Sequence, residues 1–223
     1  MIGILGYGEV GQAIAQCYRY TPLIKDLNRD EIKNQELEVL HVCIPWSETF
    51  LEDVKKIKTE LVIIHSTVPV GTTELIPNAV HSPVRGIHPF LFEGLKTFIK
   101  FVGTNDEELG RLAVKHLEFG GMRCEPLKGT RTTELGKLLD TTYYGVCIEF
   151  HRYAKELCDE YGLNFEDVMT KFNQSYNEGY TFLKKTNVIR PVLIPPQGEI
   201  GGHCIRQNAK LLTKKFEGGN LWK

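Results

Sequence analysis

The first eleven residues place an apolar strand, three glycines and the start of a helix in immediate succession, and this order constrains the fold more than any other stretch. Residues 2–5 form a short apolar run, as in a strand covered on both faces. Gly6, Gly8 and Gly11 follow in G-x-G-x-x-G spacing. In such a loop the first glycine permits the tight turn, the second lets the backbone approach a pyrophosphate, and the third lets the helix pack closely on the strand. The order therefore predicts a dinucleotide-binding loop, with phosphate on the free N–H groups of the helix.

A carboxylate follows at the position where this type of loop requires one. The second expected strand, residues 22–26, ends in Asp26, which is placed to accept a hydrogen bond from a ribose 2'-hydroxyl. Because the same charge would repel a 2'-phosphate, the predicted cofactor is NAD rather than NADP. The alternative is a simple glycine turn with an unrelated surface aspartate.

Strand and helix patterns alternate from the first residue to about residue 127, which is typical of parallel strands joined by covering helices. Further strands are expected at 39–44, 61–64, around Val80, at 98–102 and at 123–125, and helices at 10–18, 48–58, 72–76 and 107–119. We therefore expect an α/β fold in which residues 1–128 form a Rossmann-type, doubly wound parallel sheet that binds NAD. The predicted cofactor-binding residues are Gly6, Tyr7, Gly8, Glu9, Val10, Gly11, Asp26, Ile44, Pro45, Ser66 and Thr67.

The pattern changes to helices alone in residues 129–223, which are expected to form a small all-α domain. Residues 132–161 contain no proline and carry apolar residues on more than one face, which predicts one long helix. Because that helix needs more cover than this short region supplies, we expect a homodimer built on it. Gly162 is expected to end the long helix, and Asn164 to cap a shorter helix at 165–176. A loop is expected at 179–202 and a last helix at 206–215.

Composition excludes several classes of function. The net charge of −1 provides no basic excess for nucleic acid or for an anionic membrane, and no apolar run is long enough to span a bilayer. The six cysteines are scattered without C-x-x-C pairs, which favours the reducing cytoplasm over a disulfide scaffold. The first residues already belong to the strand, so no signal peptide is expected. We expect no metal, since the spacing of the histidines and Cys204 matches no common ligand pattern.

Four separated stretches resemble the family of UDP-glucose and UDP-N-acetyl-hexosamine 6-dehydrogenases. They are the amino-terminal glycine loop, Ser-Thr-Val-Pro-Val-Gly-Thr at 66–72, Glu-Leu-Gly-Lys at 134–137 and Gly-Gly-His-Cys-Ile at 201–205. The resemblance covers nearly the whole chain to Ile205, and the last motif is the most specific. The 6-phosphogluconate and β-hydroxyacid dehydrogenases share the glycine loop, a long helix and its lysine, but they lack the Gly-Gly-x-Cys element.

The resemblance implies roles for three residues. Cys204 matches the family's nucleophile, which attacks an aldehyde so that a second hydride transfer gives a thioester that water cleaves. Lys137 matches the lysine that stabilises the developing alkoxide, and Thr67 matches the threonine that orients water near the nicotinamide. These residue types suit the chemistry, because a thiolate is a strong nucleophile near neutral pH and an ammonium stabilises an oxyanion. The structural alternatives are a small buried thiol for Cys204 and a solvated helix lysine for Lys137.

The sequence departs from the family pattern at three positions. Thr141 replaces an asparagine, Asn208 replaces an acid, and Val84 stands where the family has glutamate. The loss of two carboxylates removes a candidate base, which weakens the expectation of full four-electron oxidation. Family members also continue into a second domain that holds UDP, whereas this chain ends at Lys223, so the resemblance implies a truncated form.

The substrate is expected to be a small molecule, possibly a sugar or hydroxyacid derivative. The candidate substrate-binding residues are Arg85, His88, Thr141, His203 and Asn208. Three functions stay open: an NAD-dependent dehydrogenase with covalent catalysis, a two-electron hydroxyacid dehydrogenase without it, and a cofactor-binding regulatory or assembly protein without turnover. His88 is placed either to act as acid or base in place of the missing glutamate or to bond a backbone carbonyl.

Overall fold

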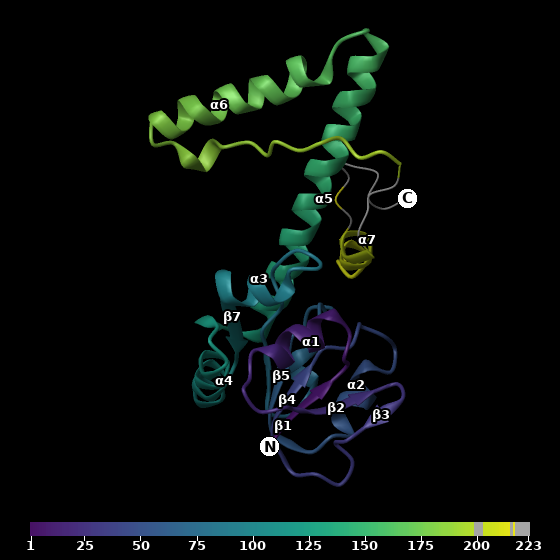
Figure 1. Ribbon diagram of the computed structural model, residues 1–223, viewed down its shortest axis with the longest axis vertical. Coiled ribbons are helices and arrows are strands. Elements are labelled where there is room, and N and C mark those ends of the chain that lie inside the picture. Colours follow the sequence, from purple (N-terminus) through teal and green to yellow (C-terminus); the bar gives the residue numbers. More distant parts are fainter. Residues whose placement is uncertain (199–202, 215, 217–223) are drawn as a thin grey trace. The chain divides into compact units, whose positions relative to one another are not determined.

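The computed structural model describes residues 1–198, 203–214 and 216 (Figure 1). The chain divides into two compact units, Met1–Lys137 and Leu138–Lys223, and the division falls inside the long helix α5 (Thr130–Glu160). The first unit contains one sheet with helices on both faces, and the second is helical. The expected α/β class, with a Rossmann-type sheet followed by a small all-α region, is confirmed.

The first unit is built on an eight-stranded sheet in the order β3-β2-β1-β4-β5-β6-β7-β8. The bounds are β1 (Ile2–Leu5), β2 (Leu23–Asp26), β3 (Arg29–Asp30), β4 (Leu37–Val42), β5 (Thr59–Ile64), β6 (Ala79–His81), β7 (Ile99–Thr104) and β8 (Arg123–Lys128). The five adjacent strands β2, β1, β4, β5 and β6 run parallel to one another. Strand β3 pairs antiparallel with β2, and β7 pairs antiparallel with β6. Because β1 lies between β2 and β4, the direction of winding reverses there. Ligands of doubly wound sheets bind at the carboxyl ends of the strands at this reversal.

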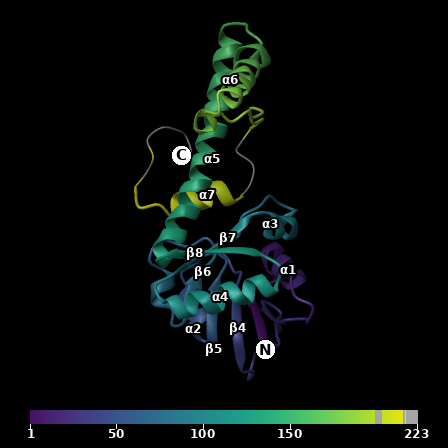
Figure 2. The same cartoon turned by 90° about the vertical axis from the view of Figure 1, so that its left-hand side faces the viewer.

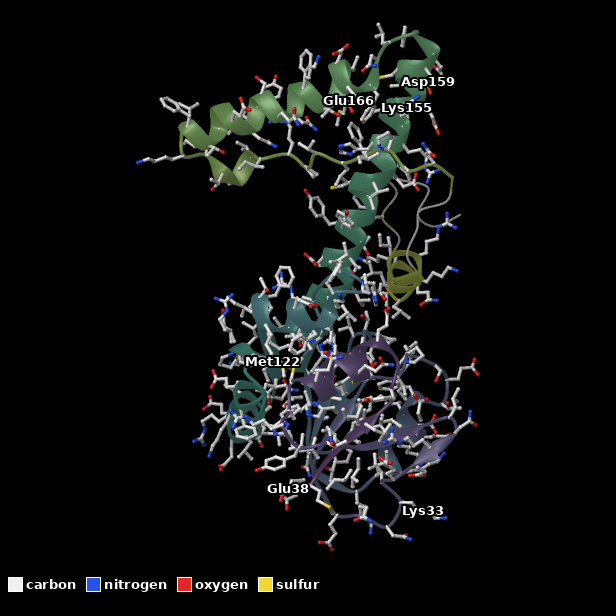
Figure 3. All side chains as sticks on the ribbon, viewed as in Figure 1. Lys33, Glu38, Met122, Lys155, Asp159 and Glu166 are labelled. Atoms are coloured by element: carbon white, nitrogen blue, oxygen red, sulfur yellow. The ribbon has the colours of Figure 1, made fainter. Side chains whose placement is uncertain are left out.

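Both faces of the sheet are covered, as the short apolar strands predict. One face packs against α1 (Glu9–Gln16), α3 (Leu91–Thr97) and α4 (Glu107–Phe119), with Ile4, Ile63 and Val102 fully buried. The other face packs against α2 (Phe50–Lys55) and the short η1 helix (Thr73–Leu75). Figure 2 shows α4 lying along β7 and β8. Met122, labelled in Figure 3, is buried in the first of these cores, directly after α4.

In the second unit, α5 is followed by a π-helical turn (Glu166–Thr170), α6 (Lys171–Phe182), η3 (Thr186–Val188) and α7 (His203–Lys210). Gly162 adopts the expected positive φ of 63° after α5, and the Asn164 carboxamide accepts the Asp167 N–H at 3.2 Å, as expected of a cap. The chain after α6 runs back along it (Figure 1), because Asn177 hydrogen-bonds both the N–H and the carbonyl of Arg190. None of the described helices is both long and apolar enough to cross a bilayer.

The structure corrects several expected element limits. Helix α3 is an element that the sequence analysis did not predict, because its sequence is short and contains Gly94. That glycine instead allows close packing, since a Cβ there would lie 2.8 Å from the Arg85 carbonyl oxygen. Helix α6 continues through Gly179 instead of ending at 176, at a cost of about 1 kcal/mol for a glycine in a helix. The last helix covers His203–Lys210 rather than 206–215.

Candidate dinucleotide site and its neighbours

The glycine loop has the geometry that its spacing predicts. Gly6 follows β1 with a φ of 91°, and its N–H donates to the Lys25 carbonyl at 2.8 Å. A side chain at Gly6 would be strained at this φ and would meet Ile44 at 2.8 Å. At Gly11 a Cβ would lie only 2.0 Å from the Gly6 carbonyl oxygen, so α1 can pack this closely only with glycine there.

Gly8 differs from the other two glycines, because a Cβ built on it meets nothing within 4 Å. Its requirement for glycine therefore does not come from the protein's own packing. Gly8 is the N-cap of α1, so the N–H groups of the first turn, at Glu9 and Val10, point out of the helix start without intrahelical acceptors. This open space beside helix N–H groups suits an anion such as a pyrophosphate.

Asp26 lies at the end of β2 beside this loop. Its Oδ2 accepts the Tyr7 N–H and its Oδ1 accepts the Leu27 N–H, both at 2.7 Å. Each carboxylate oxygen still has a lone pair for a further donor, such as a ribose hydroxyl. Arg29 lies over the Tyr7 ring at 5.7 Å and forms an ion pair with Glu31 at 2.8 Å.

The loops after β4 and β5 lie at the same edge of the sheet as the glycine loop and form the next part of the candidate site. The Ser66 hydroxyl lies within hydrogen-bonding distance of the Ile44 carbonyl at 2.6 Å and of the Val42 carbonyl at 3.3 Å. Thr67 is half-buried, and Val68 after it is anchored in the core. The predicted residues Ile44, Ser66 and Thr67 thus share the carboxyl edge of neighbouring strands with the glycine loop.

The first turns of α5 are bonded to the loop that follows β5. Glu134 is fully buried, and its carboxylate accepts hydrogen bonds from Gly71 and Thr73. His81 lies between the Thr133 hydroxyl at 2.8 Å and the Ser66 carbonyl at 3.1 Å, and burial lowers the pKa of His81 to about 3. The sequence analysis did not predict these roles of His81 and Thr133. The one available indication was that both residues lie among apolar residues, which indicates burial.

The two substrate candidates on the loop after β6 have partners within the first unit. The Arg85 guanidinium lies over the rings of Phe101 at 5.3 Å and Phe98 at 5.7 Å. The exposed His88 contacts the carboxylate of Glu9 through its Nδ1. His88 therefore lies at the first turn of α1, beside the glycine loop, where it contacts a carboxylate.

In the second unit, two of the three residues that depart from the family pattern contact each other. The Asn208 carboxamide on α7 donates to the Thr141 hydroxyl on α5 at 3.3 Å, and Ile205 packs against Val146 and Ile148 of α5. Residues 199–202 and the side chains of His203 and Cys204 lie outside the described part of the chain.

A row of three imidazoles, which the sequence did not predict, runs from the loop after β5 through β4 to α4, and two of the three are buried. His65 Nδ1 lies 3.0 Å from the Ser82 carbonyl, so this nitrogen must donate. In the neutral form His65 Nε2 then accepts from His41 Nδ1 at 2.8 Å, and His41 Nε2 accepts from His116 Nε2 at 3.0 Å. Burial lowers the pKa of His41 and His65 well below the usual value and that of His116 to about 4. These imidazoles therefore stay neutral at neutral pH.

Lys100 extends this buried row on β7. Its ammonium donates to the Ser82 carbonyl and, at 3.0 Å, to the Pro83 carbonyl, which fixes the start of the loop carrying Arg85 and His88. Burial lowers the pKa of Lys100 to about 7, against an opposing effect of nearby thiols such as Cys124.

Comparison with known proteins agrees with the motifs. No family model matches the chain. It is 24% identical over 201 residues to a UDP-N-acetyl-D-mannosamine dehydrogenase of Methanocaldococcus jannaschii, and 22% identical over 204 residues to that of Methanococcus maripaludis. These matches cover 86% and 87% of this chain but only 43% of each relative. The chain therefore spans less than half the length of the curated relatives it matches.

Solved structures share the fold. The UDP-N-acetyl-D-mannosamine dehydrogenase of Pyrococcus horikoshii superposes with a TM-score of 0.77 at 21% identity, over 96% of this chain and 65% of that one. A 3-hydroxyisobutyrate dehydrogenase of Mycobacterium tuberculosis superposes with a TM-score of 0.65 at 17% identity, over 94% and 84%. The chain is thus similar in sequence to UDP-N-acetyl-D-mannosamine dehydrogenases, in agreement with the resemblance that its four motifs indicate.

Proposed function

We propose that the protein is an NAD-dependent dehydrogenase that oxidises an alcohol, or the derived aldehyde, of a small molecule. The observation that carries this proposal is the geometry of the glycine loop at the reversal of the sheet. Gly6 and Gly11 are required by packing, whereas Gly8 faces open space at the start of α1. A glycine that the protein itself does not need is best explained by a ligand that approaches the backbone there.

The residues around the loop fit a dinucleotide without a 2'-phosphate. Asp26 stands beside Tyr7 at the end of β2, where a carboxylate accepts ribose hydroxyl bonds and repels a phosphate. Arg29 is the nearby cation that could accept a 2'-phosphate, but its guanidinium is paired with Glu31. These charges favour NAD over NADP.

Bound NAD⁺ would supply the hydride acceptor. Lys137 would stabilise the oxygen of the substrate as its C–H bond breaks, since an ammonium in a site that excludes water favours an oxyanion strongly. Thr67, at the carboxyl edge of β5, would orient a water molecule beside the reacting carbon. Ser66, bonded to the loop after β4, would support the cofactor side of the site.

In the four-electron form of the proposed reaction, which oxidises an alcohol to an acid, Cys204 would be the nucleophile. Its thiolate would add to the carbonyl carbon of the aldehyde, and loss of a hydride to a second NAD⁺ would convert the adduct into a thioester. Water would then cleave the carbon–sulfur bond and release the acid and the thiol. His203, the preceding residue, would favour the thiolate when protonated.

The competing proposal is a two-electron dehydrogenase of the hydroxyacid type. It is favoured by the bond between Asn208 and Thr141, because neither side chain can act as the base that the family's acid provides. A non-catalytic, cofactor-binding role remains the third proposal, supported by the same loss of carboxylates.

The stoichiometry of NADH formation separates these proposals. UDP-N-acetyl-D-mannosamine is the first substrate to test, because the relatives that the sequence matches are named for it, and 3-hydroxyisobutyrate is the second. Covalent catalysis predicts two NADH per substrate and loss of the acid product in Cys204→Ser. One NADH per substrate, with Cys204→Ser nearly as active as wild type, supports the two-electron form. No turnover with any sugar nucleotide or hydroxyacid, despite NAD binding, would leave the non-catalytic role.

We also propose a homodimer that uses helix α5. Its exposed side chains include the apolar residues Leu139, Tyr143, Tyr144, Phe150 and Tyr153. Apolar surface of this extent on one helix is typical of an interface. Light scattering at micromolar concentration should give twice the mass of the 25.4 kDa chain, and a monomer would contradict the proposal.

The five described cysteines are free thiols, which supports a cytoplasmic location.

A further inference from the structure

The loop of residues 66–73 is held at both ends by the start of α5. At one end, the Glu134 carboxylate accepts three hydrogen bonds: from the Gly71 N–H at 2.6 Å, the Thr73 N–H at 2.8 Å and the Thr73 hydroxyl at 2.6 Å. Both oxygens of Glu134 are used, and its side chain is fully buried. Hydrogen bonds to a buried carboxylate are among the stronger ones in proteins.

At the other end, the neighbouring residue on α5 reaches the loop through an imidazole. Thr133 bonds His81, and His81 bonds the carbonyl of Ser66. Because the carbonyl can only accept, His81 donates to it through Nε2, which leaves Nδ1 to accept the Thr133 hydroxyl in the neutral form. Two adjacent helix residues thus fix the first and last parts of one loop.

A third link between α5 and this region lies at the surface. Arg131 donates to Glu74 from two of its nitrogens, at 2.9 and 2.7 Å. The Arg131 side chain is 66% exposed, so solvent weakens this pair. The buried contacts of Glu134 therefore carry most of the attachment, and the surface pair offers a control.

We infer that Glu134 is a positioning residue, whose carboxylate fixes the loop carrying Ser66 and Thr67 to the helix that carries Lys137. Glu134 and Lys137 lie about one turn apart on α5, so a loop bonded to Glu134 keeps a constant position relative to the backbone of Lys137. This inference rests on the proposed function, in which Thr67 and Lys137 flank the reacting carbon. A shift of about 1 Å between such groups can reduce turnover about a hundredfold.

The test is Glu134→Gln in the full chain. Glutamine keeps the volume and accepts from Thr73 through its carbonyl oxygen, but its NH₂ group then faces the Gly71 N–H, and two donors cannot bond each other. Amide exchange at Gly71 should become at least about tenfold faster. With turnover, kcat should fall at least about tenfold, and by more than the KM for NAD⁺ rises, because the glycine loop and Asp26 are not touched.

Glu74→Gln is the matched control, because it removes a carboxylate from the same region that binds α5 only at the surface. It should leave exchange at Gly71 and kcat close to wild type. If Glu134→Gln does not fold, Thr73→Val removes one of the three donors to Glu134 and should give a smaller change in the same direction.

Unchanged exchange at Gly71 in Glu134→Gln would overturn the inference, as would faster exchange with an unchanged kcat. If the wild-type chain turns over no substrate, the proposed function fails, and the exchange rates alone decide whether Glu134 anchors the loop: faster exchange supports the anchoring, and unchanged exchange contradicts it.

Discussion

Lowering the pH from 7 to 5.5 should reduce the unfolding free energy of the sheet unit by at least about 4 kcal/mol, because three fully buried imidazoles in it stay neutral. His41, His65 and His81 are each at most 2% exposed. Burial holds the pKa of His41 and His65 far below the usual value, and that of His81 at about 3. The hydrogen-bonded row adds to this, since a second proton on His41 would set two N–H groups against each other.

The magnitude follows from the unfolded chain, in which each of these histidines has a pKa of about 6.5. The native pKa is depressed, so the stabilisation is fully present above pH 6.5 and is lost as the pH falls, because only the unfolded state takes up protons there. Each imidazole that stays neutral at pH 5.5 contributes a loss of about 1.3 kcal/mol relative to pH 7, so the three contribute about 4 kcal/mol. The half-buried His116, whose pKa burial lowers to about 4, adds about 1 kcal/mol. Carboxylates titrate mainly below this window.

Urea unfolding at the two pH values measures the effect. Trp46 lies 5.3 Å from the Phe50 ring in the core of the sheet unit, so its fluorescence follows that unit once Trp222 is replaced by Phe. In His41→Leu the difference between the two pH values should shrink by about 1.3 kcal/mol. The control Val42→Ala, which shortens a buried side chain without a titrating group on the same strand, should leave the difference unchanged. Equal unfolding free energies at both pH values, or an unchanged difference in His41→Leu, would refute the reasoning.

Three further substitutions test the two loop glycines and the buried lysine. Gly11→Ala should destabilise the fold by several kcal/mol, because the new Cβ would meet a backbone oxygen at 2.0 Å. Gly8→Ala should keep the wild-type melting temperature but weaken NAD binding at least about tenfold. Equal melting temperatures for the two variants would contradict this. Lys100→Met should remove about 1 kcal/mol of the rise in stability expected between pH 7 and 8, since the depressed pKa of Lys100 makes the unfolded state bind more protons in that range. The buried thiols of Cys43 and Cys124, whose pKa values are raised, act in the opposite direction only at higher pH. The same rise in the variant would show that another group causes it.

The sequence predicted the parts of the fold that local pattern determines. The glycine spacing identified the turn after β1, and alternating apolar runs located the parallel strands within a few residues. Asn164 and Gly162 marked helix ends because caps act locally. Helix α3 escaped prediction, since Gly94 is a breaker in isolation and becomes favourable only where a backbone carbonyl approaches it.

In the candidate site too, local sequence pattern predicted some residues and could not predict contacts between distant ones. Asp26 could be placed beside the glycine loop from the order of elements alone. The roles of Glu134 and His81 depend on residues about fifty positions or more away in the chain, and no periodicity reveals which buried polar groups bond one another. The bond between Asn208 and Thr141 is of the same kind: both positions were noticed as departures, but their contact required the fold.

Calorimetric titration with NAD⁺ and NADP⁺ tests the central claim most directly, because it measures the dinucleotide site without requiring a known substrate. The account predicts that NAD⁺ binds at least about tenfold more tightly than NADP⁺, and that Asp26→Ala narrows the difference chiefly by weakening NAD⁺. Tighter binding of NADP⁺, or no binding of either dinucleotide, would contradict it.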